Sequence, residues 1–149
     1  MEQYFKEFAI YNDRLYAISQ YNFGDKLEID QNDNLIVEHP NALRWIQRKI
    51  KNQSSSGLID YMTLHIGAYA NFIDTIYTIN QEYNDYYKFL VTNYTLVGNI
   101  LPGLYRLMDY YCSKTSPNSK IYIKKIQVFI QLLTNHHIKL KTSLGIGTD

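Results

Sequence analysis

Apolar residues recur at three- and four-residue steps through the middle of this chain. In residues 58–80 they form one continuous stripe, made of Leu58, Met62, Ile66, Tyr69, Ile73 and Ile76. An α-helix brings residues at this spacing onto one face, whereas a half-buried strand requires strict alternation. We therefore predict a helix over residues 58–80 that buries this stripe in a core.

Weaker patterns of the same period predict further helices on both sides of this segment. They cover residues 3–19, 41–52, 81–97, 99–112 and 120–141. Residues 14–20 are also compatible with a strand, because aromatic and β-branched residues suit strands. In the helices over 81–97 and 99–112, we expect Tyr87 and Tyr105 to point inward.

Serine, asparagine, glycine and proline residues mark the expected ends of these helices. Ser56 is expected to cap the helix over residues 58–80. Gly98 and Asn99 are expected to break the pattern, so that Asn99 caps a new helix. Pro102 then falls in the first turn, where a missing N–H is tolerated. Gly145 is expected to end the last helix.

Residues 24–39 follow a different period. Polar and apolar side chains alternate over residues 26–30, turn formers fill residues 31–34, and Ile36 and Val37 follow. This pattern predicts a β-hairpin, which Pro40 ends. The expected fold is mainly α, a bundle of four to five helices with a small N-terminal β-hairpin.

The length of 149 residues predicts a single domain spanning the whole chain. Within it, residues 1–40 form the expected N-terminal helix and hairpin subregion. Residues 41–142 form the helical bundle, and residues 143–149 form a tail.

The composition is that of a globular protein, with 46% apolar and 19% charged residues. The single cysteine, Cys112, cannot form an internal disulfide, so we expect an intracellular protein in which Cys112 is buried. No basic and apolar leader is visible, so we do not expect secretion. The uncharged residues 89–105 fall just short of the roughly 18 residues that span a membrane, and no membrane span is expected.

Charges alternate in blocks along the chain, although the net charge is only +1. Residues 1–38 carry eight acids and three bases, and residues 39–57 carry four bases and no acid. Residues 58–112 carry five acids and two bases, and residues 113–149 carry one acid and six bases. Such blocks can attract each other within one fold or between neighbouring copies.

Common motifs for catalysis and cofactor binding do not occur in this sequence. We find no G-x-S-x-G, H-E-x-x-H, C-x-x-C or G-x-x-x-x-G-K-[ST] pattern. Residues 30–34 match the first five positions of a calcium loop, but Leu35 stands at the required Gly and Asn41 at the required Glu. A polar turn is therefore expected there, and no enzymatic activity, catalytic residue or cofactor.

Histidines are the remaining metal-ligand candidates. His136 and His137 are adjacent, so on a helix they point in different directions. His65 could meet one of them across the bundle, but a zinc site needs more ligands. We expect core or boundary histidines and no metal site.

A basic helix with one tryptophan is the most suggestive surface element. Helical spacing puts Arg44, Arg48 and Lys51 in one row, with Trp45 beside them. This row can be a solvated face, or it can bind an acidic protein, nucleic-acid phosphates or a membrane surface. We predict a protein partner, with nucleic acid as the lesser alternative.

The chain contains 15 tyrosines, which is too many for one core stripe. Ile, Tyr, Asn and Lys have AT-rich codons, so an AT-rich genome together with bundle packing explains part of this number. Tyrosine is also enriched at protein interfaces and can stack on bases. Tyr86 and Tyr110 join the basic helix as predicted partner-binding residues.

These features predict a non-enzymatic structural or assembly protein of a low-GC virus or phage, such as a minor capsid or connector subunit. It would act through protein–protein contacts in a homo-oligomer or larger assembly, in the host cytoplasm or in the virion. The alternative is a small accessory protein that binds a host or viral protein, or nucleic acid, through the helix around Trp45.

Overall fold

The structure is a computed structural model that describes residues 2–20, 27–37, 50, 54–77, 86–114 and 117–146. These residues form four helices: α1 (Glu2–Gln20), α3 (Ser55–Tyr77), α4 (Tyr86–Cys112) and α5 (Pro117–Leu144). They also form two strands, β1 (Leu27–Ile29) and β2 (Leu35–Val37). The fold is mainly helical, as the sequence predicted.

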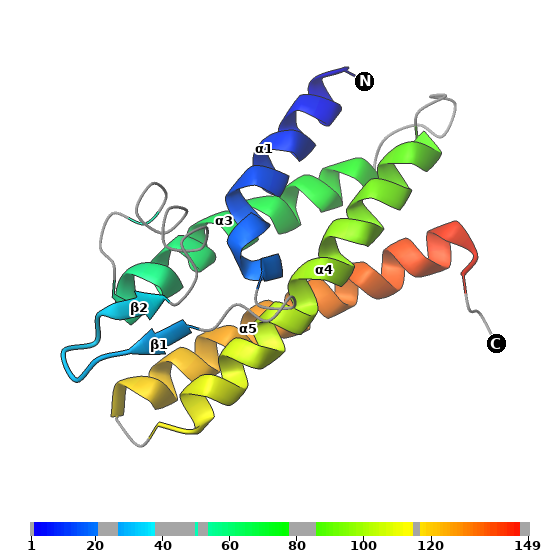
Figure 1. Cartoon of the computed structure of the whole chain (residues 1–149). Coiled ribbons are helices and arrows are strands. Elements are labelled where there is room, and N and C mark those ends of the chain that lie inside the picture. Colours follow the sequence, from blue (N-terminus) through cyan, green and yellow to red (C-terminus); the bar gives the residue numbers. More distant parts are fainter. Residues whose placement is uncertain are drawn as a thin grey trace.

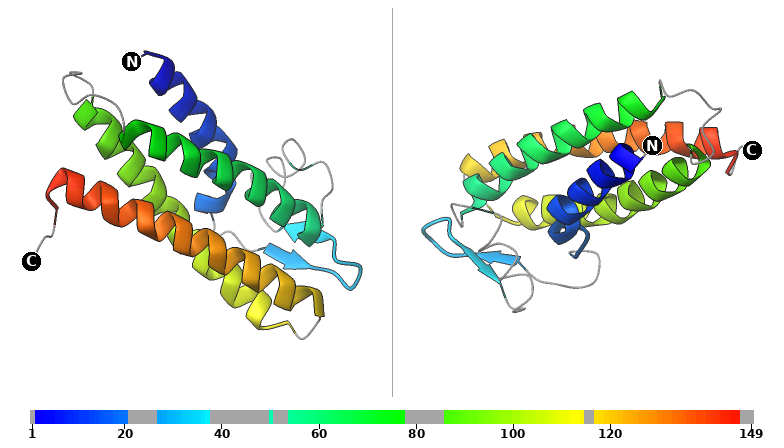
Figure 2. Two further views of the ribbon diagram at one scale, coloured as in Figure 1. Left: turned by 180° about the vertical axis from the view of Figure 1, so that it is seen from behind. Right: turned by 90° about the horizontal axis from the view of Figure 1, so that it is seen from above.

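The four helices enclose one core in the order α3, α1, α4 and α5 (Figures 1 and 2). α4 and α5 run side by side and share the most extensive helix contact. α1 packs chiefly on α4 and touches α3 along one edge, and α5 closes the arrangement against α3. The predicted stripe of α3 lines this core, with Met62, Ile66 and Tyr69 fully buried.

α1 confirms the predicted N-terminal helix and excludes the extended alternative for its second half. Leu15, Ile18 and Ser19 are buried, and this three- and four-residue spacing is helical. The Ser19 hydroxyl donates a hydrogen bond of 2.6 Å to the Tyr16 carbonyl within the helix.

β1 and β2 pair antiparallel, with Ile29 opposite Leu35. The turn between them is an Asx turn, because Asp30 Oδ1 accepts hydrogen bonds from the backbone N–H groups of Asn32 and Asn34. Asp33 has a φ of 66°, in the left-handed region that Asp tolerates better than most residues. This turn lies at the end of the bundle where α4 ends and α5 begins (Figure 1).

α3 begins three residues earlier than predicted, and its cap is a different serine. Ser54 Oγ accepts a hydrogen bond of 3.1 Å from the Gly57 N–H, which is the geometry of an N-cap. The prediction that Ser56 caps the helix was wrong, because Ser56 already lies inside α3. The Ser55 N–H also donates to the Asp33 carbonyl, which ties the turn to the start of α3.

α4 is one helix of 27 residues, so the predicted break at Gly98 and Asn99 was wrong. Val97 and Ile100 are both buried, and helical geometry through this segment keeps them on the core side. Pro102 lies inside α4, where it removes one helical hydrogen bond, and the helix continues through it to Cys112. The prediction that Tyr87 and Tyr105 point inward was wrong: they are 68% and 47% exposed, because other residues of α4, such as Phe89, Val97 and Leu104, form its buried face.

α5 starts at Pro117, whose fixed φ suits the first turn of a helix. It ends at Leu144, three residues beyond the predicted end, and Gly145 follows with a φ of 70° that allows the Ile146 N–H to donate to the Lys141 carbonyl. Cys112 is exposed, so its predicted burial was wrong. Of the helix predicted over residues 41–52, only Ile50 is described, and it is buried and not helical.

None of the described helices is both long enough and apolar enough to cross a lipid bilayer. The uncharged residues 89–105 instead form the middle of α4, where Phe89, Val97 and Leu104 are buried in the protein core.

Candidate functional site

The predicted basic row falls on a part of the chain that is not described. Arg44, Trp45, Arg48 and Lys51 all lie outside the described residues. Their role in binding a partner stays a prediction from the sequence.

Tyr86 and Tyr110, the two other predicted partner-binding residues, lie at opposite ends of α4. They are twenty-four residues apart, which is about 36 Å along a helix. Tyr86 is half-buried against the core. The Tyr110 hydroxyl accepts a hydrogen bond of 2.5 Å from the Ile29 N–H, so Tyr110 joins α4 to β1. The structure therefore does not bring the two tyrosines together.

An exposed face of α4 lies between them. Tyr87, Val91 and Tyr105 are 68%, 37% and 47% exposed. Tyr87 and Tyr105 are eighteen residues apart, which is five full turns, so they project from the same side of the helix. From Phe89 to Tyr105 the helix carries no charged residue. We call Tyr87, Val91 and Tyr105 the α4 tyrosine face.

The edge of this face is packed against α5. The ring of His137 stacks on Tyr94, with centroids 4.4 Å apart and ring planes 9° apart. A Cβ atom at Gly98 would lie 3.5 Å from His137 Nε2, an ordinary contact distance, so Gly98 faces the imidazole ring across the α4–α5 contact. Burial lowers the pKa of His137, and the nearby Lys141 lowers it further. His137 is thereby a neutral packing partner of α4 at neutral pH.

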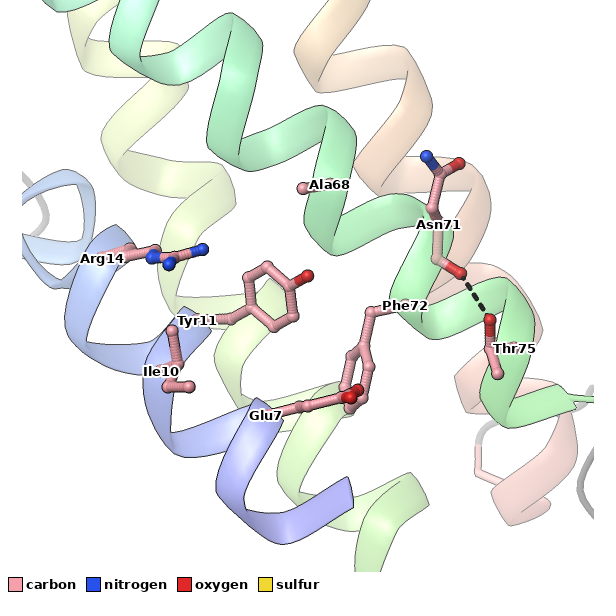
Figure 3. Close-up of a pocket in the computed structure, with 8 residues that line it drawn as sticks. All are labelled: Glu7, Ile10, Tyr11, Arg14, Ala68, Asn71, Phe72 and Thr75. Atoms are coloured by element: carbon pink, nitrogen blue, oxygen red, sulfur yellow. Dashed lines mark hydrogen bonds between the residues drawn. The ribbon is translucent and has the colours of Figure 1, made fainter. Parts of the chain in front are cut away.

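A groove of about 290 Å³ separates α1 from α3 (Figure 3). It is lined by Glu7, Ile10, Tyr11, Arg14, Ala68, Asn71, Phe72 and Thr75. The Tyr11 and Phe72 rings, 5.2 Å apart between centroids, join the two helices across it. We call this feature the α1–α3 groove.

The rim of the α1–α3 groove carries one charge of each sign. Glu7 and Arg14 both come from α1, and Figure 3 shows them on either side of Tyr11. The Arg14 guanidinium lies 5.8 Å from the centroid of the Tyr11 ring. The Tyr61 hydroxyl donates a hydrogen bond of 2.9 Å to the Arg14 carbonyl, and burial raises the pKa of Tyr61 to about 12. These contacts hold α1 in place beside α3.

A second cavity, of about 330 Å³, lies beside the turn of the two strands. Its polar residues include Asp30, Asp33, Lys114 and Ser119. Backbone hydrogen bonds, chiefly from Asn34, hold the pKa of Asp30 below its usual value. The Tyr122 hydroxyl donates a hydrogen bond of 2.9 Å to Asp33 Oδ2. Both carboxylates of the predicted polar turn therefore stabilise the local fold.

The three helix histidines have separate environments. His65 packs on Tyr61, with ring centroids 4.2 Å apart, and His137 packs on Tyr94. His136 is buried, with its Nε2 3.8 Å from Asp74 Oδ1. They do not meet across the bundle. Among the residues that the structure describes, no three His, Cys, Asp or Glu side chains come together in a way that could hold a metal ion.

The α4 tyrosine face is the feature that sequence reasoning missed. The signal was present in the uncharged residues 89–105, but Tyr87 and Tyr105 were assigned to the inward stripes of the two predicted helices. Comparisons of the chain with protein-family models, with curated proteins and with solved structures found no match.

Proposed function

We propose that this chain is a non-enzymatic structural subunit that acts through protein–protein contacts. The α4 tyrosine face carries this proposal, because it exposes Tyr87, Val91 and Tyr105, and α4 carries no charged residue from Phe89 to Tyr105. Tyrosine covers a large area at low cost in side-chain entropy and is enriched at protein interfaces. The occupant we propose for this face is a neighbouring copy of the chain.

The charge distribution supports assembly from copies of one chain. α5 carries five lysines and no acidic residue, namely Lys120, Lys124, Lys125, Lys139 and Lys141. Residues 1–38 carry a net charge of −5 from eight acids and three bases. Opposite charges on different parts of the same subunit favour contact between neighbours and discourage other orientations.

Polar residues in both cavities support a structural role. The Thr75 hydroxyl in the α1–α3 groove donates to the Asn71 carbonyl within α3. Beside the strand turn, the hydrogen bonds of Asp30 and Asp33 stabilise the turn and anchor it to α5. The codon bias toward Ile, Tyr, Asn and Lys supports a low-GC virus or phage as the source, and a virion component as the class of subunit.

The test removes the α4 tyrosine face and compares it with a matched change on α5. The triple variant Tyr87→Ser/Val91→Ser/Tyr105→Ser should lose the largest assemblies that the unmodified chain forms in sedimentation velocity. The control, Ile121→Ser/Val128→Ser/Ile138→Ser, removes three side chains that are 53%, 63% and 57% exposed on α5. It should keep those assemblies. Equal sizes for the unmodified chain and the α4 variant would contradict the proposal.

A further inference from the structure

The side of α1 that borders the α1–α3 groove is self-complementary in charge. Glu7 and Arg14 are seven residues apart, so they project from one side of the helix with about 10.5 Å between them along its axis. Ile10 lies between them along the helix and is 47% exposed. An acid, an exposed apolar residue and a base therefore follow one another along this edge (Figure 3).

We propose that a second copy of this chain docks here, with its α1 antiparallel to the first α1 around a two-fold axis near Ile10. A two-fold axis reverses the direction of the helix. Glu7 of each copy is then brought to Arg14 of the other, and both pairs form in the same step. The two Ile10 side chains meet between the pairs.

The side of α1 that faces away from the groove also carries one acid and one base. Lys6 and Asp13 are both exposed and are also seven residues apart, in the opposite order of sign. The same axis therefore brings Lys6 of one copy toward Asp13 of the other. Charge complementarity on both sides of Ile10 favours this antiparallel orientation over others.

α3 supplies the apolar part of the docking surface. Leu64 is 65% exposed and lies one helical turn before Ala68, whose small side chain lines the groove. Tyr11 and Phe72 line the groove between the two helices. Covering Ile10 and Leu64 removes apolar area from water, which stabilises the pair. Because each copy contributes mainly one helix and its neighbour, we expect a weak, concentration-dependent dimer.

This pairing rests on the proposed function in that both concern contacts between copies, but it uses a different surface from the α4 tyrosine face. Failure of one can therefore be separated from failure of the other. A dimer that persists in Tyr87→Ser/Val91→Ser/Tyr105→Ser supports pairing through the α1–α3 groove. Larger assemblies that persist when Glu7 or Arg14 is reversed in charge support contacts through the α4 tyrosine face alone.

The test uses two single charge reversals and their mixture. Glu7→Arg places two like-charged pairs in the dimer, and Arg14→Glu does the same with the opposite sign. Each variant alone should dimerise about tenfold more weakly than the unmodified chain in sedimentation equilibrium at low salt. An equimolar mixture restores both attractive pairs and should form a heterodimer, and the double variant Glu7→Arg/Arg14→Glu should again form a homodimer.

Recovery in the mixture shows that the single variants are folded, and far-UV circular dichroism checks each one. Lys120→Glu makes a charge reversal of the same size on α5 and should leave the dimer unchanged. A chain that stays monomeric up to about 1 mM, the weak limit of measurable pairing, overturns the inference. The inference is also overturned if the mixture dimerises no better than its two components, or if a single charge reversal leaves the dimerisation constant unchanged.

Discussion

Gly103 of α4 lies directly against the backbone of Ile18 in α1. A Cβ atom at Gly103 would stand 1.9 Å from the Ile18 carbonyl oxygen and 2.9 Å from its carbonyl carbon. Real Cβ atoms do not approach backbone atoms this closely, so no side chain fits here. This close approach sets how α1 crosses α4, and thereby positions α1 beside α3.

Gly103→Ala should lower the free energy of unfolding by about 3 kcal/mol or more, because α1 must move away from α4. Urea unfolding followed by circular dichroism measures this change. Gly67→Ala is the matched control, since a Cβ atom at Gly67 meets nothing within 4 Å. That variant should gain about 0.5–1 kcal/mol from better helix propensity. Equal effects at the two glycines would show that α1 and α4 do not touch as described.

The Tyr69 hydroxyl donates a buried hydrogen bond of 2.9 Å to Asn93 Oδ1, which joins α3 to α4 across the core. The amide Nδ2 of Asn93 donates in turn to the Phe89 carbonyl. Tyr69→Phe removes the donor to Oδ1 and should cost about 1–3 kcal/mol. A double-mutant cycle with Asn93→Leu should give a coupling energy of at least about 0.5 kcal/mol. If the effects of the two substitutions on the free energy of unfolding are additive, the hydrogen bond between Tyr69 and Asn93 contributes nothing to stability.

The environment of His136 should make the free energy of unfolding depend on pH below neutrality. Burial lowers the pKa of His136, Asp74 acts against this, and Lys139 lowers it further. The unfolded chain therefore binds a proton near pH 6.5 while the folded chain still holds the neutral ring. Stability from the neutral ring is present above pH 6.5 and falls as the pH drops below that value. Urea unfolding between pH 7 and pH 5 should show this loss, with a smaller slope in His136→Gln; an unchanged slope in that variant would contradict the assignment.

The environment of Tyr122 should make the free energy of unfolding fall at alkaline pH. Burial, and then the hydrogen bond to Asp33, raise the pKa of Tyr122 to about 12. The unfolded chain releases this proton near pH 10, so stability from the neutral phenol is lost as the pH rises from about 10 to 12. Phenolate absorbance of the folded chain should therefore show tyrosines that ionise late, and one fewer in Tyr122→Phe. Ionisation of all tyrosines near pH 10 while the chain is folded would exclude this environment.

Local pattern predicted the individual helices better than their continuity. The stripe of α3 is visible in the sequence because its residues from Leu58 to Ile73 are buried in the core at helical spacing. α4 was divided at Gly98 because glycine and proline usually interrupt helices. In the structure Gly98 lies inside continuous α4 and faces His137, a residue nearly forty positions later. No local signal contains that contact, and tertiary packing decides it.

The two candidate surfaces differ in how far the sequence predicts them. The α4 tyrosine face follows from the sequence once α4 is continuous, since Tyr87 and Tyr105 are then five turns apart. The α1–α3 groove does not follow from the sequence. It brings Tyr11 and Phe72 together from distant segments, and the contact between Gly103 and Ile18 positions α1 for this.

Native mass spectrometry of the untagged chain in low salt tests whether this chain assembles with copies of itself. We expect homo-oligomers, with dimers through the α1–α3 groove and larger species that disappear in Tyr87→Ser/Val91→Ser/Tyr105→Ser. A single species of 17.6 kDa at every concentration would contradict a structural subunit built from copies of this chain.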